Sequence, residues 1–178
     1  MVVPFAMLLN LASVSGAEDK EALWGFIRRY APEAGPDTHP GLDAAAGNAV
    51  RYFQDFVKPQ RVFRSPDAKE RAAMEDLVRA LRDGDVALDL IARKNALAGK
   101  EGDPLPEIDW HSDEFLQSVV FAVGKVHGFE PLRDWFKALY EVLLGASEGP
   151  RFGGFIALYG VDETVALIER GLAGDLAA

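Results

Sequence analysis

Prolines and glycines divide this chain into short segments in which apolar residues recur every three to four positions. Each such apolar stripe occupies one face of a helix, and the breaking residues between stripes mark where helices end. Alternating patterns long enough for a sheet are absent from the sequence. The pattern therefore predicts an all-α fold of roughly eight or nine helices, paired antiparallel and stacked into a cage or bundle.

Residues with capping chemistry predict where several of these helices begin. The tetrad Ser15 to Glu18 fits a capping box that opens one helix, and Pro40 suits the first position of the next. Ser65-Pro66 is predicted to start a third helix. Ser112 and Asp162 are expected to cap two later ones, because their side chains can accept from free N–H groups.

The domain organisation is predicted from length and from one loop. A chain of 178 residues suffices for one domain with a real core or for two small lobes. Glycines and prolines cluster between Gly99 and Pro106. We therefore expect a single helical region over residues 1–178, with two lobes at 1–98 and 107–178.

Composition excludes several classes of protein. Without cysteine, the chain has no disulfide, thiolate metal site or cysteine nucleophile, and its three histidines are too scattered to suggest a metal cluster. No apolar run reaches the ~18 residues that a membrane helix needs. The apolar stretch from Val2 to Ala12 lacks a preceding basic residue and a clear cleavage site, so no signal peptide is expected. These features predict a cytoplasmic protein with no membrane partner and no bound metal.

The charge is unevenly distributed. A net charge of -9 argues against a general nucleic-acid binder, since phosphate contacts need positive surface. Residues 1–66 nevertheless carry seven basic and seven acidic residues, whereas residues 67–114 carry seven and thirteen. The first third of the chain is therefore the one in which a phosphate-binding surface is expected.

A tryptophan and an arginine share one face of the first capped helix. Trp24 and Arg28 lie four residues apart, off the apolar stripe, and Arg29 follows them. An exposed tryptophan beside a cation can stack on a splayed base and hold its phosphate. In the alternative, Trp24 packs against the second lobe or another domain. Tyr52 and Phe56 flank the next stripe in the same way, although Phe56 could simply widen the buried face.

A basic segment lies between Pro59 and Pro66. Lys58, Arg61 and Arg64 alternate there with apolar residues, and with the arginines of the preceding helices they form the densest basic and aromatic grouping in the chain. A solvated loop and a phosphate-tracking edge are both compatible with this pattern.

The stretch Gly149 to Gly160 combines breaking residues with the start of an apolar helix. It presents Arg151 and Phe152 on a turn at a helix N-terminus, where an anion is favoured. A plain packed turn is the alternative. Gly153-Gly154 lacks the preceding strand and the Lys-Ser/Thr of a phosphate-binding loop, and no acid/base pair occurs elsewhere, so no catalytic residue is predicted.

As a whole, this stretch (GPRFGGFIALYG) resembles the C-terminal region of the class I lysyl-tRNA synthetases. Two further segments, Leu23 to Pro32 and Trp135 to Gly145, support the resemblance and occur in the family's order. It implies a helical cage similar to the anticodon-binding cage of the glutamyl enzymes. The implied function is to read the uridine-rich anticodon loop of lysine tRNA, in a single-stranded conformation.

The resemblance also implies what this chain lacks. The family's enzymes activate lysine with ATP and transfer it to lysine tRNA. They use a catalytic Rossmann domain with a His-x-Gly-His element and a Lys-Met-Ser-Lys-Ser-like loop, and neither motif occurs here. We therefore expect the chain to need its catalytic domain as a partner, to bind no ATP itself and to be inactive alone. A serine is common in the family where this chain has Gly154, which leaves Arg151 as the better candidate for a polar role.

Two other classes of function stay open. The chain could be a helical protein-interaction module derived from that domain, with the acidic middle segment as its working surface. It could also be a helical enzyme with a buried pocket, although no acid/base constellation supports this.

Overall fold

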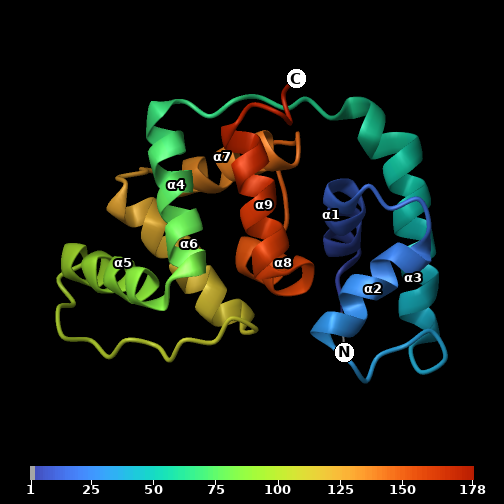
Figure 1. Ribbon diagram of the computed structural model, residues 1–178, viewed down its shortest axis with the longest axis horizontal. Coiled ribbons are helices and arrows are strands. Elements are labelled where there is room, and N and C mark those ends of the chain that lie inside the picture. The colour runs from blue at the N-terminus through green and yellow to red at the C-terminus, as the bar shows by residue number, and fades with distance from the viewer. Residues whose placement is uncertain (1–2) are drawn as a thin grey trace.

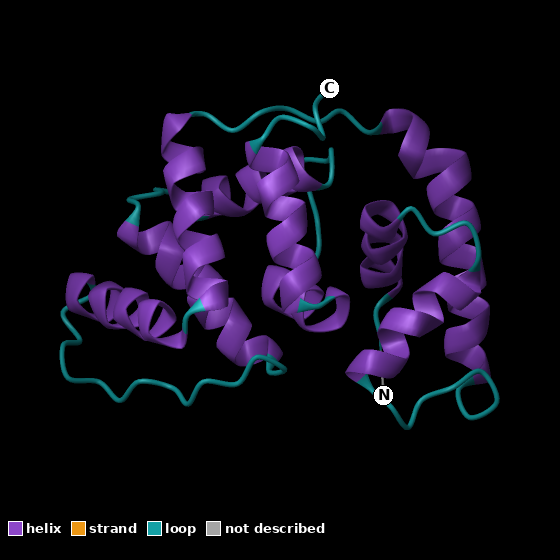
Figure 2. Cartoon of the chain, viewed as in Figure 1, coloured by secondary structure: helices purple, strands orange, loops and turns teal. Residues whose placement is uncertain are grey.

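The computed structural model describes residues 3–178, so that Met1 and Val2, at the start of the apolar stretch considered as a signal peptide, lie outside it. Within these residues the chain forms nine α-helices and no strand, as Figures 1 and 2 show. This confirms the all-α fold and the expected number of helices. No helix in the described part of the chain is long and apolar enough to cross a membrane.

The helices are α1 (Phe5–Ser15), α2 (Lys20–Tyr30), α3 (Pro40–Tyr52), α4 (Ala68–Arg82), α5 (Gly84–Leu97), α6 (Asp113–Val126), α7 (Arg133–Leu143), α8 (Phe152–Tyr159) and α9 (Val161–Leu172). A π-helical turn, η1 (Phe53–Val57), and a 3₁₀ turn, η2 (Lys58–Gln60), continue α3.

Two of the predicted helix starts are confirmed. Pro40 occupies the first position of α3, where its missing N–H costs nothing. The Ser112 side chain caps α6 by accepting from the backbone N–H of Phe115.

The Ser15 capping box is wrong. Ser15 is the last residue of α1, and its hydroxyl donates to the carbonyl of Leu11. Gly16 ends that helix with φ +65°, and Asp19 caps α2 by accepting from Ala22 N–H. The pattern misleads because the apolar stretch before Ser15 forms a helix of its own, which uses the serine at its end.

Two other starts are displaced by one or two residues. The cap of α4 is Asp67, and it forms a full capping box with Glu70. Asp162 lies in the first turn of α9 and Gly160 precedes that helix, so the aspartate complements the helix dipole and does not cap.

The helices form two groups with α8 between them (Figure 1). Helices α1 to α3 pack together on one side, and α4, α5, α6, α7 and α9 on the other. Helix α8 contacts α6 and α9 in one group and α1 and α2 in the other. Buried residues of both groups belong to one connected apolar core.

Contacts also cross the predicted lobe boundary. Helix α5 precedes the loop from Gly99 to Pro106 and α6 follows it, yet the two pack against each other. Helix α4 likewise packs on α6 and α9. The lobes 1–98 and 107–178 therefore stay a prediction about how the chain divides.

Candidate nucleic-acid interface

The stretch from Gly149 to Gly160 allows α8 to pack closely against α6. Gly153 lies where α8 crosses α6, and a Cβ atom there would collide with the backbone of Asp113 and Gln117. Its N–H donates to the side-chain oxygen of Gln117 at 2.7 Å. A glycine is therefore required for the close approach of the two helices.

Phe152 is part of that packing and does not face solvent. Its side chain is fully buried, with its ring centroid 5.5 Å from that of Phe155 and 6.5 Å from that of Tyr140. The expectation that Phe152 is presented on the turn is wrong, because the first turn of α8 directs its side chain into the core.

Arg151 is the residue that the turn does present. It directly precedes α8, is exposed, and lies 3.4 Å from Asp113 through its Nη1 atom. Together with Tyr30 and Gly154 it lines a hollow of about 290 Å³ between α1, α2 and α8. An exposed ion pair of this length contributes little to stability, so the guanidinium can exchange its partner for a phosphate.

A second hollow, of about 280 Å³, shares Tyr30 and Leu158 with the first. Arg29, Trp110 and His111 also line it. We call the two hollows together the α2–α8 groove. It brings two aromatic side chains and two arginines together from three separate parts of the chain.

Arg29 stabilises one side of this groove by hydrogen bonds between helices. Its guanidinium donates to Glu163 at 2.7 Å and to the carbonyl of Tyr159 at 2.8 Å, which ties α2 to α8 and α9. The hydrogen bond from Arg29 lowers the pKa of the Glu163 carboxyl below its usual range. Arg29 is therefore already paired, and its contribution to the groove is to hold its shape.

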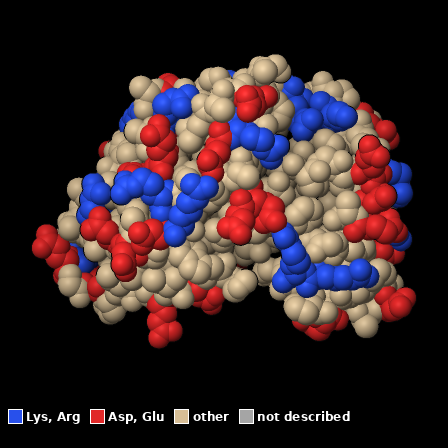
Figure 3. Space-filling view, viewed as in Figure 1, with Lys and Arg blue, Asp and Glu red and all other residues tan. Residues whose placement is uncertain are grey.

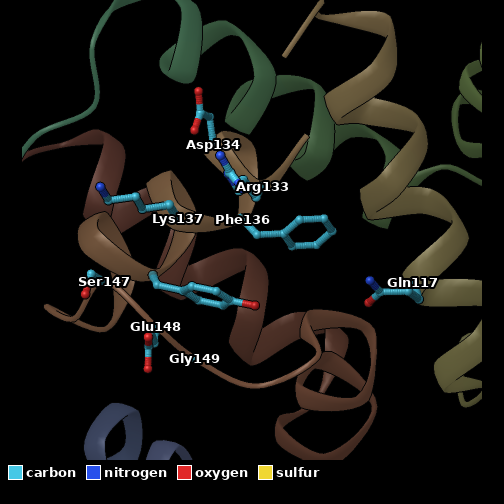
Figure 4. A pocket seen from close by; sticks show the side chains of 9 residues that line it. Gln117, Arg133, Asp134, Phe136, Lys137, Ser147, Glu148 and Gly149 are labelled. Atoms are coloured by element: carbon cyan, nitrogen blue, oxygen red, sulfur yellow. The ribbon is translucent and has the colours of Figure 1, made fainter. Parts of the chain in front are cut away.

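Another pocket, of about 780 Å³, lies on the other side of the Gly149–Arg151 turn, between α6, α7 and the loop that follows α7. Arg133, Phe136 and Lys137 enter it from α7, and Gln117 faces them from α6, as Figure 4 shows. Two acidic residues also line it. The pocket is therefore mixed in charge.

The Tyr140 ring forms a wall of this pocket. Its hydroxyl donates to the carbonyl of Pro150 at 2.6 Å and holds the turn before Arg151 in place. Burial raises the pKa of this phenol, which stays protonated at neutral pH and keeps donating.

Trp24, which was predicted to stack on a base, is not exposed. The Trp24 side chain is only 2% exposed, and its indole N–H donates to Asp43 at 2.9 Å. Arg28 is exposed, with its guanidinium 5.8 Å from the centre of the Trp24 ring. The expectation of a solvent-facing Trp24 is wrong, because α3 covers this face of α2. Trp24 is packed, but against α3 of the same group of helices and not against the second lobe that the alternative named.

The basic segment is neither a solvated loop nor a free edge, since two of its three cations are held by the fold. Arg61 donates to Ser13, and its guanidinium lies 5.1 Å from the ring of Phe53 and 5.2 Å from that of Phe63. Burial lowers the pKa of Arg61. Lys58 is exposed.

Arg64 is held more firmly than Arg61. It makes two hydrogen bonds to Glu70, at 2.7 and 2.9 Å, and a third to Glu141 at 2.9 Å. These bonds, chiefly those to Glu70, raise the pKa of Arg64. Two carboxylates already neutralise this cation, so it is not free for a phosphate.

Sequence reasoning missed the aromatic side chains of the groove. Tyr30 was assigned to the buried stripe of its helix, yet it is 42% exposed, because it is the last residue of α2 and the chain turns away after it. The signal for this was Pro32, which ends the helix within two residues. Trp110 and His111 lie just before α6, with no local pattern to mark them.

Charge on the molecule is mixed at short range. Figure 3 shows lysine and arginine side chains interspersed with aspartate and glutamate over the face it displays. Of the predicted residues, the structure brings Arg29 and Arg151 to the groove, whereas Tyr52, Lys58, Arg61 and Arg64 lie on α3 or the segment that follows it, away from the groove lining.

Comparison with known proteins gives one consistent group of relatives. The chain is 57% identical over 176 residues to the lysine–tRNA ligase of Roseobacter denitrificans. The aligned region covers 99% of this chain and 29% of that protein. It is 40% identical over 167 residues to the lysine–tRNA ligase of Rickettsia conorii (94% of this chain and 28% of that protein). The lysine–tRNA ligase of Rickettsia bellii matches at 40% over 170 residues (96% and 28%).

The chain thus spans less than a third of the length of these relatives, and it corresponds to their C-terminal region. The resemblance to the C-terminal part of lysyl-tRNA synthetases is thereby confirmed. No protein-family model matches the chain. No solved structure matches it either.

Proposed function

We propose that this chain is the tRNA-binding part of a lysine–tRNA ligase of the class I type, and that it contacts the anticodon loop of lysine tRNA. The observation that carries the proposal is the similarity to lysine–tRNA ligases over 99% of the chain. An enzyme of this kind has to distinguish its tRNA from others, and an all-α region without an acid/base constellation suits recognition better than chemistry.

The α2–α8 groove supports the same proposal. Single-stranded RNA is bound by aromatic rings on which bases stack and by cations that hold the backbone. The groove offers the exposed ring of Tyr30 for a base and the weakly paired Arg151 for a phosphate. Because the chain carries a net charge of -9, we expect binding to depend on these few contacts and not on a broad basic surface.

The ligase activity itself, with ATP and lysine, belongs in this proposal to the larger part of the full-length protein, and we place that protein in the cytoplasm. The chain alone should not catalyse lysine-dependent exchange between ATP and pyrophosphate, since it lacks both ATP-binding motifs of the class I enzymes. Exchange above background with the purified chain would contradict this part of the proposal.

A binding titration tests the anticodon assignment. The folded chain is titrated with lysine tRNA and with the same tRNA carrying another anticodon, at two salt concentrations. Tyr30→Ala should weaken binding by about five- to a hundredfold, because stacking of one base contributes ~1–3 kcal/mol. Arg151→Ala should lower the slope of log affinity against log salt by about one phosphate contact.

Arg93→Ala is the matched control for Arg151→Ala, since Arg93 is an exposed arginine with a weak ion pair on α5, outside the lining of the groove. It should leave the affinity and the salt slope unchanged. Equal affinity of the wild-type chain for both tRNAs would remove the anticodon assignment. Normal binding by both groove variants would place the site elsewhere.

A further inference from the structure

Three exposed aromatic rings meet on the N-terminal helices, outside the α2–α8 groove. Phe5 at the start of α1, Tyr52 at the end of α3 and Phe56 in η1 are 42%, 46% and 57% exposed. The ring centroids of Phe5 and Tyr52 are 6.2 Å apart, and those of Tyr52 and Phe56 are 5.1 Å apart. We call these three residues the aromatic patch.

The patch differs from the other aromatic contacts of the molecule. In every other ring pair within residues 3–178, at least one of the two rings is buried. Adjacent exposed rings are unfavourable in water, since burying apolar surface is the main source of stability. Contiguous exposed apolar surface of this kind marks an interaction site.

A local feature of the backbone keeps Phe56 on the outside. The chain leaves α3 through the π turn η1, in which Phe53 points into the core with 3% exposure, while Phe56 remains outside. Such π turns are rare and are frequently found at functional sites. The exposure of Phe56 is therefore set by the fold and is not a consequence of fraying at a helix end.

We propose that the aromatic patch is the docking surface for the part of the full-length protein that precedes this chain. The proposal rests on the proposed function, because the identity of that preceding part comes from the ligase relatives. The chain is 29% of the length of the Roseobacter protein and corresponds to the C-terminal region, so most of the ligase lies before it.

The position of Phe5 connects the patch with that preceding part. Phe5 lies two residues after Val3, where the described chain begins, and its ring is in contact with Tyr52. In the full-length protein the preceding part is therefore joined only a few residues before Phe5 in sequence. Covalent linkage raises the effective concentration of the two parts into the millimolar range, so that a small apolar contact suffices to dock them.

The charges around the patch favour a protein partner over RNA. Binding of a single strand needs cations that track its backbone beside the rings. Here Arg51, next to Tyr52, donates to the side chain of Asn48, and the acidic Asp55 precedes Phe56. With Lys58 two residues after Phe56, the charges beside the patch are mixed in sign, which suits a polar interface between domains better than the backbone of a nucleic acid.

The test compares hydroxyl-radical labelling of the full-length ligase with that of the 178-residue chain, each without tRNA. We expect Phe5, Tyr52 and Phe56 to be oxidised several-fold more slowly in the full-length protein. Phe121, which is 36% exposed on α6, is the matched control and should react equally in both. Equal labelling of the three patch residues in both proteins would overturn the proposal.

Two other patterns of protection would also overturn it. Protection that appears only when tRNA is added would make the patch an RNA-binding surface. Protection of the isolated chain that increases with its concentration would make the patch a contact between copies. A tRNA titration of the same samples tests the proposed function separately, so that its failure is distinguishable from failure of the docking surface.

A substitution provides a second measurement. Phe56→Ser should leave the Tm of the isolated chain unchanged, since the ring makes few internal contacts, but should lower the resistance of the full-length protein to proteolysis between its parts. Phe121→Ser should change neither. Unchanged resistance in the full-length Phe56→Ser protein would contradict docking at the patch.

Discussion

Two of the connections between helices differ in how they are held: one is bonded to neighbouring helices, whereas the other makes local hydrogen bonds. The first, at residues 61–67, crosses from the N-terminal helices to α4, and the second, at residues 98–112, crosses from α5 to α6. Their compositions do not predict this difference. The first is basic and reads as a mobile, RNA-tracking loop, whereas the second contains the glycines and prolines of an ordinary linker.

The first connection is held along its length. Arg61 reaches Ser13, the backbone N–H of Val62 donates to Gly145 at 2.9 Å, and Arg64 binds Glu70 and Glu141. Its cations therefore tie α1, α4 and α7 together.

The second connection is exposed at every residue from 98 to 109. Its backbone hydrogen bonds are local, as between Asp103 N–H and the carbonyl of Lys100. The helices at its two ends, α5 and α6, hold each other directly. Arginines in a connection can thus hold neighbouring helices together. The flexibility of a connection has to be judged from its contacts and not from its charge.

Limited proteolysis should give the largest difference between the two connections. Trypsin should cleave after Lys100 about a hundredfold faster than after Arg61, because cleavage in the first connection requires local unfolding that costs several kcal/mol. Mass spectrometry of the early fragments measures both rates. Comparable cleavage at the two positions would show that the first connection is not fastened in solution.

Removing a side chain that holds the first connection should lower the free energy of unfolding more than removing a side chain of the second connection. Glu70→Ala takes away two ionic hydrogen bonds to Arg64 and half of the α4 capping box, which should lower the free energy of unfolding by about 3 kcal/mol. Glu101→Ala, in the second connection, should change it by less than about 0.5 kcal/mol. Urea unfolding of both variants measures the difference, and similar values would refute the contrast.

Glycine substitutions separate backbone strain from packing. Gly145 and Gly99 both adopt positive φ, +68° and +72°, so alanine at either should cost about 1–2 kcal/mol. A Cβ atom on Gly145 would also lie 3.1 Å from Arg61 and from Phe63, whereas one on Gly99 meets nothing within 4 Å. Gly145→Ala should therefore cost about 1 kcal/mol more in thermal unfolding. If the two alanine substitutions lowered the stability equally, Arg61 and Phe63 would be able to move away from the new Cβ atom without a loss of stability.

Low pH should weaken the first connection, because protonation of Glu70 weakens its hydrogen bonds with Arg64. The hydrogen bond from Arg64 lowers the pKa of Glu70 below its ordinary 4.5, so the folded chain binds this proton less tightly than the unfolded chain. The stabilisation is complete above pH 4.5 and is lost as the pH falls through the lower pKa of the folded state. The stability difference between wild type and Glu70→Gln should therefore shrink below pH 4.5. A difference that is independent of pH would exclude a titrating Glu70.

Features that depend on neighbours three or four residues away could be predicted from the order of residues alone. The all-α fold and the starts at Pro40 and Ser112 follow from apolar spacing and capping, because a helix satisfies its hydrogen bonds locally. Even there, the Ser15 box was misread, since the same residues can end one helix or begin another. The similarity to lysyl-tRNA synthetases was also visible in the order of residues alone.

Which side chains are free to bind depends on how the helices pack against one another. Trp24 is covered by α3, and Arg64 is neutralised by Glu141, which lies 77 residues further along the chain. Conversely, Tyr30 and Arg151 meet in one hollow although 120 residues separate them. Burial and ion pairing depend on contacts between helices distant in sequence, and no local pattern of residues carries that information.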